Sequence, residues 1–107
     1  MWNQPMSLSV LMRHAELATL CRRYGVSRLD LFGSAATGTD RPGLSDLDFL
    51  VEFKAPSSAD YADNYFDLKE ALERLFGHPI DLVVASAIRN PYFRESVERA
   101  KLSVYAA

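Results

Sequence analysis

Three aspartates, Asp46, Asp48 and Asp81, lie on or beside short apolar segments that predict β-strands. Acidic residues are depleted in strands, and burying one is costly unless it is paired or bound to a metal. Residues i and i+2 of a strand project from one face about 6–7 Å apart, so Asp46 and Asp48 can reach the same ion or two adjacent ions. Asp81 can approach from a neighbouring strand. An oxygen-only ligand set favours Mg²⁺, and a pair of such ions serves phosphoryl or nucleotidyl transfer.

A Gly-Ser pair supplies the second chemical feature of the chain. Gly33-Ser34 follows the apolar segment Leu29–Phe32. A glycine after a strand lets the backbone approach a ligand closely, and the next helical turn offers free N–H groups to an anion. A plain turn with a serine helix cap is the alternative for this pair alone. The pair, the two aspartates and the third strand aspartate, taken in this order, are far more specific together.

The segments around these residues are predicted to alternate between helices and strands, which would bring the residues together. Periodicity and breakers predict helices over 7–24 and 61–76, and a last helix over 86–101 that is interrupted or restarted at Pro91. Strands are predicted over 26–32, 47–53 and 80–84, with a helical turn at 35–37, a loop over 38–45 and a tail strand or docked coil at 104–105. This order favours a single α/β domain over residues 1–107, with a small sheet flanked by helices.

Composition excludes several classes of protein. The 107 residues are 49% hydrophobic and 24% charged, as expected of a globular domain, and the net charge of −2 argues against a general nucleic-acid binder. The sequence predicts no membrane span, and its start does not resemble a signal peptide. The single cysteine, Cys21, is predicted to be a buried thiol in a reducing compartment, which makes the cytoplasm the expected location.

Some candidate residues are given structural roles. Asp30 is expected to be a charge on the sheet face or strand edge, and only secondarily a fourth site carboxylate. Tyr61, Tyr65 and Phe66 are expected to pack in the core, with a partner surface or an adenine pocket as the alternative. Glu52 lies on the acidic face of its strand but beyond the site.

The motifs together closely resemble the minimal nucleotidyltransferases, small members of the DNA polymerase β-like nucleotidyltransferase superfamily. The matching segments are Leu31–Ser34, the loop with Gly38, Ser45–Val51 and Ile80–Val83. The resemblance spans about residues 25–84, and the flanking helices fit the same plan. It implies the nucleotidyltransferase fold, a small mixed β-sheet flanked by helices.

The resemblance also implies a role for each motif residue. Gly33 and Ser34 would hold the triphosphate, and Asp46 and Asp48 would ligate both magnesium ions. Asp81 would ligate the catalytic metal and help to deprotonate the attacking hydroxyl. The implied reaction transfers AMP, or another nucleotide, from a nucleoside triphosphate such as ATP to an acceptor, with release of pyrophosphate.

One position departs from the family pattern. Many minimal nucleotidyltransferases carry an arginine in the turn before the second glycine, where this chain has Thr37. The change removes a positive charge that helps to hold phosphates. Arg41 or Arg89 is a candidate to compensate for it.

Stand-alone domains of this size resemble the antitoxins of two-gene toxin–antitoxin pairs. The resemblance implies a helical HEPN toxin as partner and one of its tyrosines as the acceptor of AMP. Two other functions are open: a module that neutralises a partner by occlusion without catalysis, and one subunit of a split small-molecule nucleotidyltransferase. Loss of partner neutralisation when the aspartates become asparagines would separate transfer from occlusion.

Overall fold

The computed structural model describes residues 10, 12–33, 47–55, 59–77 and 79–107. They form a four-stranded sheet in the order β3-β2-β1-β4. The strands are β1 (Val26–Phe32), β2 (Leu47–Phe53), β3 (Ile80–Val84) and β4 (Leu102–Ala106). β1 is antiparallel to both β2 and β4, whereas β2 and β3 are parallel, so the sheet is mixed.

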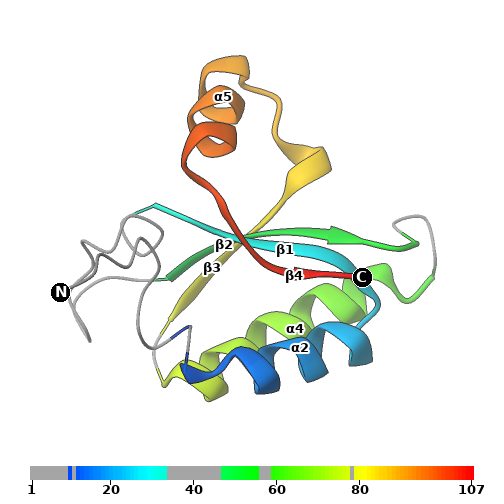
Figure 1. The fold of residues 1–107 in the computed structure, drawn as a ribbon. Coiled ribbons are helices and arrows are strands. Elements are labelled where there is room, and N and C mark those ends of the chain that lie inside the picture. The colour runs from blue at the N-terminus through cyan, green and yellow to red at the C-terminus, as the bar shows by residue number, and fades with distance from the viewer. Residues whose placement is uncertain (1–9, 11, 34–46, 56–58, 78) are drawn as a thin grey trace, which may run out of the picture.

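Helices lie on both faces of this sheet (Figure 1). α2 (His14–Arg23) and α4 (Tyr61–Phe76) cover one face, and α5 (Pro91–Ala100) stands on the other. A 3₁₀ turn, η1 (Ala85–Ala87), joins β3 to α5. The prediction of a small sheet flanked by helices is confirmed. Among the described residues, no helix has the length and apolar composition needed to cross a bilayer.

The main core lies between the sheet and the α2–α4 layer. Leu47, Phe49, Val51 and Phe53 alternate along β2 and all point into it, as the period-two pattern predicts. Cys21 of α2 is fully buried in the same core, which confirms its structural setting. Burial raises the pKa of its thiol to about 12, against the smaller opposing effect of Arg22.

A second apolar cluster lies under α5 on the opposite face of the sheet. It contains Phe32, Leu50, Ile88 and Val97. Leu50 is therefore buried although the alternation of β2 places it on the face away from the main core. The cluster packs α5 against the sheet, so this face has a small core of its own.

The predicted last helix divides into two. η1 ends at Ala87, and α5 begins at Pro91. Proline is favoured in the first turn of a helix, and it disfavours helical geometry in the residue before it. Asn90 is that residue, and its side-chain oxygen caps α5 by accepting from the N–H groups of Tyr92 and Phe93.

Candidate active site

The site lies where β1 ends and where β2 and β3 begin (Figure 1). Phe32 is the last residue of β1 and pairs with Asp48, the second residue of β2. Asp48 pairs in turn with Asp81, the second residue of β3. Since paired residues share a face and neighbouring strands are about 4.8 Å apart, the three side chains form one row across the sheet.

The backbone of Gly33 closes directly over Asp48. Gly33 has a φ of +75°, in the left-handed region, and a Cβ built there would lie 2.4 Å from Oδ2 of Asp48. A side chain at this position would have to displace the Asp48 carboxylate or the turn, and the positive φ itself favours glycine. The close approach that is seen is to Asp48, a neighbouring residue, and the predicted approach of this backbone to a phosphate stays a prediction.

The other predicted members of the site, Ser34 and Asp46, lie outside the described residues, as do the predicted turn at 35–37, Thr37 and Arg41. The part of the chain that the structure describes contains no group of three metal-ligating side chains. The described row contributes two carboxylates, from Asp48 and Asp81. Asp46, the third predicted carboxylate, directly precedes β2 in the sequence, and its role stays a prediction.

Two side chains of α4 fix the beginning of β3, where Asp81 lies. Glu73 accepts from the N–H of Ile80 at 3.2 Å and from Nζ of Lys69 at 3.0 Å. The hydrogen bond with Lys69 is the larger cause that lowers the pKa of Glu73, followed by the bond from Ile80. The pKa of Lys69 is raised chiefly by Glu73 and, to a smaller extent, by the charge of Asp81. The charge of Lys69 is thus compensated chiefly by Glu73, and this pair anchors the start of β3 to α4.

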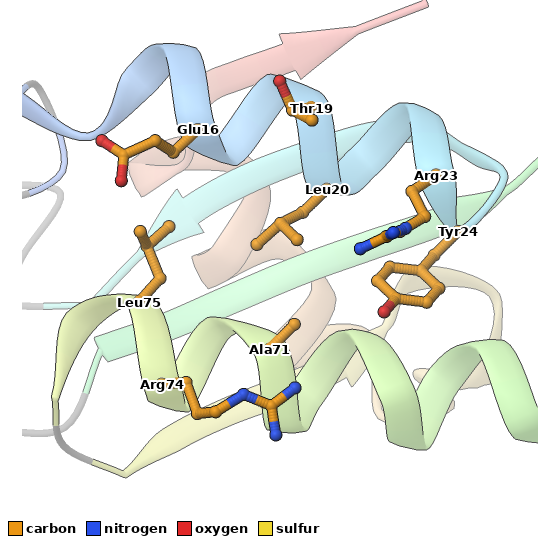
Figure 2. A pocket seen from close by; sticks show the side chains of 8 residues that line it. All are labelled: Glu16, Thr19, Leu20, Arg23, Tyr24, Ala71, Arg74 and Leu75. Atoms are coloured by element: carbon orange, nitrogen blue, oxygen red, sulfur yellow. The ribbon is translucent and has the colours of Figure 1, made fainter.

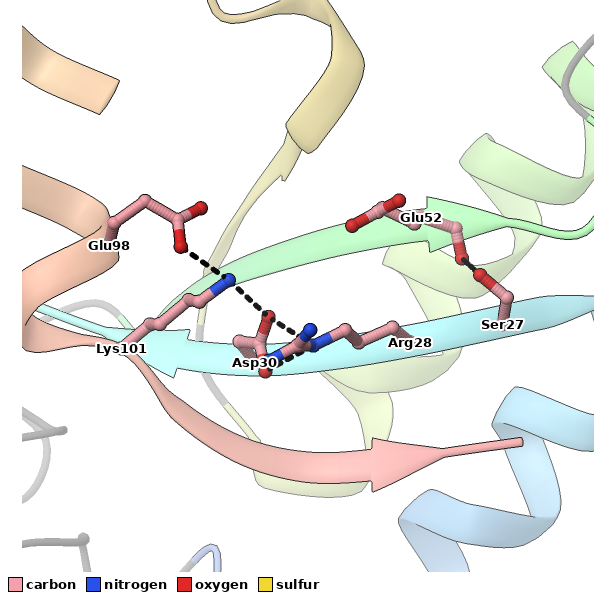
Figure 3. A network of polar contacts seen from close by, with 6 residues as sticks. All are labelled: Ser27, Arg28, Asp30, Glu52, Glu98 and Lys101. Carbon is pink, nitrogen blue, oxygen red and sulfur yellow. Dashed lines mark hydrogen bonds and ion pairs between the residues drawn. The ribbon is translucent and has the colours of Figure 1, made fainter. Parts of the chain in front are cut away.

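Asp30 has a different environment from the site carboxylates (Figure 3). Its side chain is only 2% exposed and lies 3.2 Å from Nε of Arg28 and 3.7 Å from Nζ of Lys101. Lys101 also contacts Glu98 at 2.9 Å. Buried charges are normally paired, and these two cations account for an acidic residue in β1. Asp30 is therefore a structural charge on the sheet face, as its primary prediction stated.

The aromatic residues of α4 do not line the site. Tyr61 and Tyr65 pack against the main core, as predicted, but Phe66 is 65% exposed and its predicted burial is wrong. All three belong to the helical layer on the opposite face of the sheet from Asp48. Sequence reasoning missed an aromatic residue that does lie next to the row: the ring of Phe93 contacts Phe32 edge-to-face. Its only sequence signal was its spacing of four residues from Val97.

A hollow of about 430 Å³ lies elsewhere, between α2 and α4 (Figure 2). Its walls include Leu20 and Leu75, with Arg23 and Arg74 beside them. The hollow belongs to the helical layer, and the sheet separates that layer from the face that carries Asp48 and Asp81. It contains none of the predicted site residues.

Comparisons with known proteins show the family and the fold of the chain. The family model described as a nucleotidyltransferase domain matches residues 16–104. A provisionally named protein adenylyltransferase of Methanocaldococcus jannaschii, MJ0128, is 37% identical over 89 residues, which cover 83% of this chain and 85% of that relative. A solved structure of a provisionally assigned minimal nucleotidyltransferase is 37% identical with a TM-score of 0.73, covering 91% of this chain and 95% of the other.

A more distant similarity shows the same fold. A chain in a solved complex of a tri-AMPylated Shewanella oneidensis HEPN toxin with an MNT antitoxin superposes with a TM-score of 0.62 at 15% identity. The similarity covers 92% of this chain and 73% of that one.

Proposed function

This chain belongs to the nucleotidyltransferase domain family, and we propose that it is an antitoxin that transfers AMP from ATP to a tyrosine hydroxyl of a HEPN-type partner, with Mg²⁺ as cofactor. The row formed by Phe32, Asp48 and Asp81 is the observation that carries the proposal. It places two carboxylates of a predicted triad on adjacent strands, next to the glycine turn that a phosphate site needs.

The donor chemistry fits magnesium. Asp48 and Asp81 supply carboxylate oxygens from the same sheet face, and Asp46 supplies the third carboxylate of the set. Hard oxygen donors of this kind, completed by water and substrate phosphates, are what Mg²⁺ takes in proteins. The bound ions supply the positive charge that stabilises negative charge growing on the phosphoryl oxygens.

The residues of the chain then have separate tasks. Gly33 and Ser34 hold the triphosphate through backbone N–H groups and the serine hydroxyl. The hydroxyl oxygen of the acceptor tyrosine forms a bond with the α-phosphorus of ATP, while the bond from that phosphorus to the oxygen bridging to the β-phosphate breaks. Pyrophosphate leaves with that oxygen. Asp81 accepts the proton of the attacking hydroxyl.

The choice of acceptor rests on the relatives. The similar M. jannaschii protein is named as a protein adenylyltransferase, and the structural neighbour is an assembly of an AMPylated HEPN toxin with an MNT antitoxin. A protein acceptor is common to both of these names.

The test uses α-labelled ATP, Mg²⁺ and a co-purified partner or host extract. We expect label on a partner tyrosine, identified by mass spectrometry, with the wild-type chain and none with Asp48→Asn. Glu52→Gln is the matched control, because Glu52 lies on the same face of β2 as Asp48 but four residues further along and is exposed. This control should label the partner like the wild type, and chelation of Mg²⁺ by EDTA should abolish labelling.

Each alternative function gives a different result. If the Asp48→Asn variant leaves the partner unlabelled and yet still neutralises it, occlusion is established and AMP transfer is overturned as the mechanism. Label on a small molecule and none on protein would establish a split small-molecule nucleotidyltransferase.

A further inference from the structure

An exposed aromatic ring stands immediately beside the carboxylate row. The ring centroids of Phe93 and Phe32 are 6.3 Å apart, with an interplanar angle of 75°. Phe32 is buried and is itself the strand partner of Asp48. Phe93, by contrast, keeps 43% of its surface exposed. The aromatic surface of α5 is thus continuous with the row Phe32–Asp48–Asp81.

The backbone at Phe93 is anchored at the start of α5. Its N–H donates to Oδ1 of Asn90 at 3.1 Å, and the neighbouring Arg94 guanidinium donates to the carbonyl of Ile88. One turn further along α5, Val97 is buried in the cluster with Phe32. An exposed ring on an anchored helix start, in contact with a buried ring, offers a surface for a flat ligand group.

We propose that Phe93 is the ring on which the base of the nucleotide substrate stacks. The inference rests on the proposed function, because the triphosphate must lie at Gly33 and at the carboxylate row. The base then extends beyond the phosphates, and α5 is the described element that rises from the sheet on that same face. Phe93 offers a base the aromatic face that such ligands use, whereas Phe66 lies on the opposite layer.

The experiment compares two ligands that share phosphates and differ in the base. Calorimetry with Mg²⁺ gives the dissociation constants of a non-hydrolysable ATP analogue and of inorganic tripolyphosphate. Phe93→Ala should weaken binding of the ATP analogue by about tenfold to a hundredfold, the range expected from loss of one base–aromatic stack. It should change tripolyphosphate binding by less than about twofold, since the phosphates lie at Gly33.

Three further variants separate stacking from folding. Phe93→Trp should retain or tighten binding of the ATP analogue, whereas Phe93→Leu, which keeps an apolar contact with Phe32, should lose it. Phe66→Ala removes another exposed phenylalanine, which lies on α4, and should leave the binding of both ligands unchanged. Circular dichroism of each variant checks that α5 remains folded.

The failures of the two proposals are distinguishable. If wild-type protein binds neither ligand, the nucleotide site itself is wrong and the stacking proposal falls with it. If the wild type binds both ligands and Phe93→Ala leaves the ATP analogue unaffected, only the stacking proposal is overturned. An equal loss of both ligands in Phe93→Ala also overturns it, by showing that Phe93 acts through the structure of the site. Unchanged ATP binding with reduced transfer to the partner would assign Phe93 to the acceptor instead.

Discussion

Oδ2 of Asp48 lies 2.4 Å from the point where a side chain at Gly33 would begin. The strand–turn junction is therefore built around one carboxylate. Gly33→Ala must displace either the turn or Asp48, and both belong to the proposed phosphate and metal site. We expect AMP transfer to fall at least about a hundredfold, similar to the loss of an important electrostatic contact in a transition state.

Gly77 provides the control for backbone strain. It has nearly the same conformation, with a φ of +74°, but a Cβ built there would have no atom within 4 Å, and it ends α4 in the helical layer. An alanine in the left-handed region costs about 1 kcal/mol at either position. Gly77→Ala should lower the Tm by about 4–8 °C and keep full transfer activity. Equal activities of the two alanine variants would contradict the close-approach argument.

Asp30 gives a prediction about stability. Asp30→Asn removes the charge that pairs with Arg28 and Lys101 beneath α5. Because Arg28 is partly exposed and Lys101 keeps Glu98 as a partner, we expect a loss of about 2 kcal/mol, less than for a fully buried pair. Urea unfolding measures the loss, and the double variant with Lys101→Met should show coupling between the two changes.

Binding of Mg²⁺ provides the second readout for this position. Asp30→Asn should leave Mg²⁺ affinity unchanged, because the charge of Asp30 is already compensated within the protein. If Asp30→Asn keeps the stability of the wild type but loses Mg²⁺ binding, Asp30 is a site carboxylate and its structural assignment is overturned.

Local signals explain why much of the fold was predictable. The strands at 26–32, 47–53 and 80–84 and the helix at 61–76 have the predicted bounds. Alternation of apolar residues marks the strands, and Gly77 marks the end of the helix with a positive φ. The first helix also ends where predicted, just before Gly25, while its predicted start lies outside the described residues.

Non-local pairing explains what the sequence left open. Whether residues 104–105 form a strand depends on β1, and the structure shows that β4 completes the sheet beside it. The burial of Leu50 depends on α5, which packs across the face that the alternation marked as outer. The pairing of Asp48 with Asp81 likewise depends on parallel alignment of β2 and β3, although their placement on neighbouring strands was expected.

The buried thiol of Cys21 predicts a specific dependence of stability on alkaline pH. Burial raises its pKa from 9.0 to about 12, so between these values the folded protein binds a proton that the unfolded chain has lost. The stabilising contribution is complete below pH 9 and declines as the pH rises towards 12. The slope reaches about 1.4 kcal/mol per pH unit for one group.

Cys21→Ala isolates this effect from other groups that titrate at high pH. The free energy of unfolding of the wild type relative to Cys21→Ala should be constant up to pH 9 and should decrease at pH 10 and 11. A difference that stays constant over the whole range would show that the thiol ionises equally easily in both states.

Tyr65 links α4 to the edge strand that carries Asp81. Its hydroxyl donates to the carbonyl of Leu82 at 2.6 Å, and β3 is the outermost strand on that side of the sheet. Tyr65→Phe leaves this carbonyl without its donor, which costs about 1 kcal/mol and should lower the Tm by about 4–8 °C. Phe66→Leu, at the adjacent exposed position, should leave the Tm unchanged.

Hydrogen exchange tests whether the loss is local to β3. Because Leu82 follows Asp81 directly, Tyr65→Phe should accelerate exchange of the β3 amides more than that of the β1 amides, which lie in the centre of the sheet. The mobility of Asp81 should then increase with that of the strand, and transfer activity should fall although no site residue has changed. Uniform acceleration across all strands would show instead that Tyr65 contributes only to global stability, and activity at a temperature well below the Tm should then equal that of the wild type.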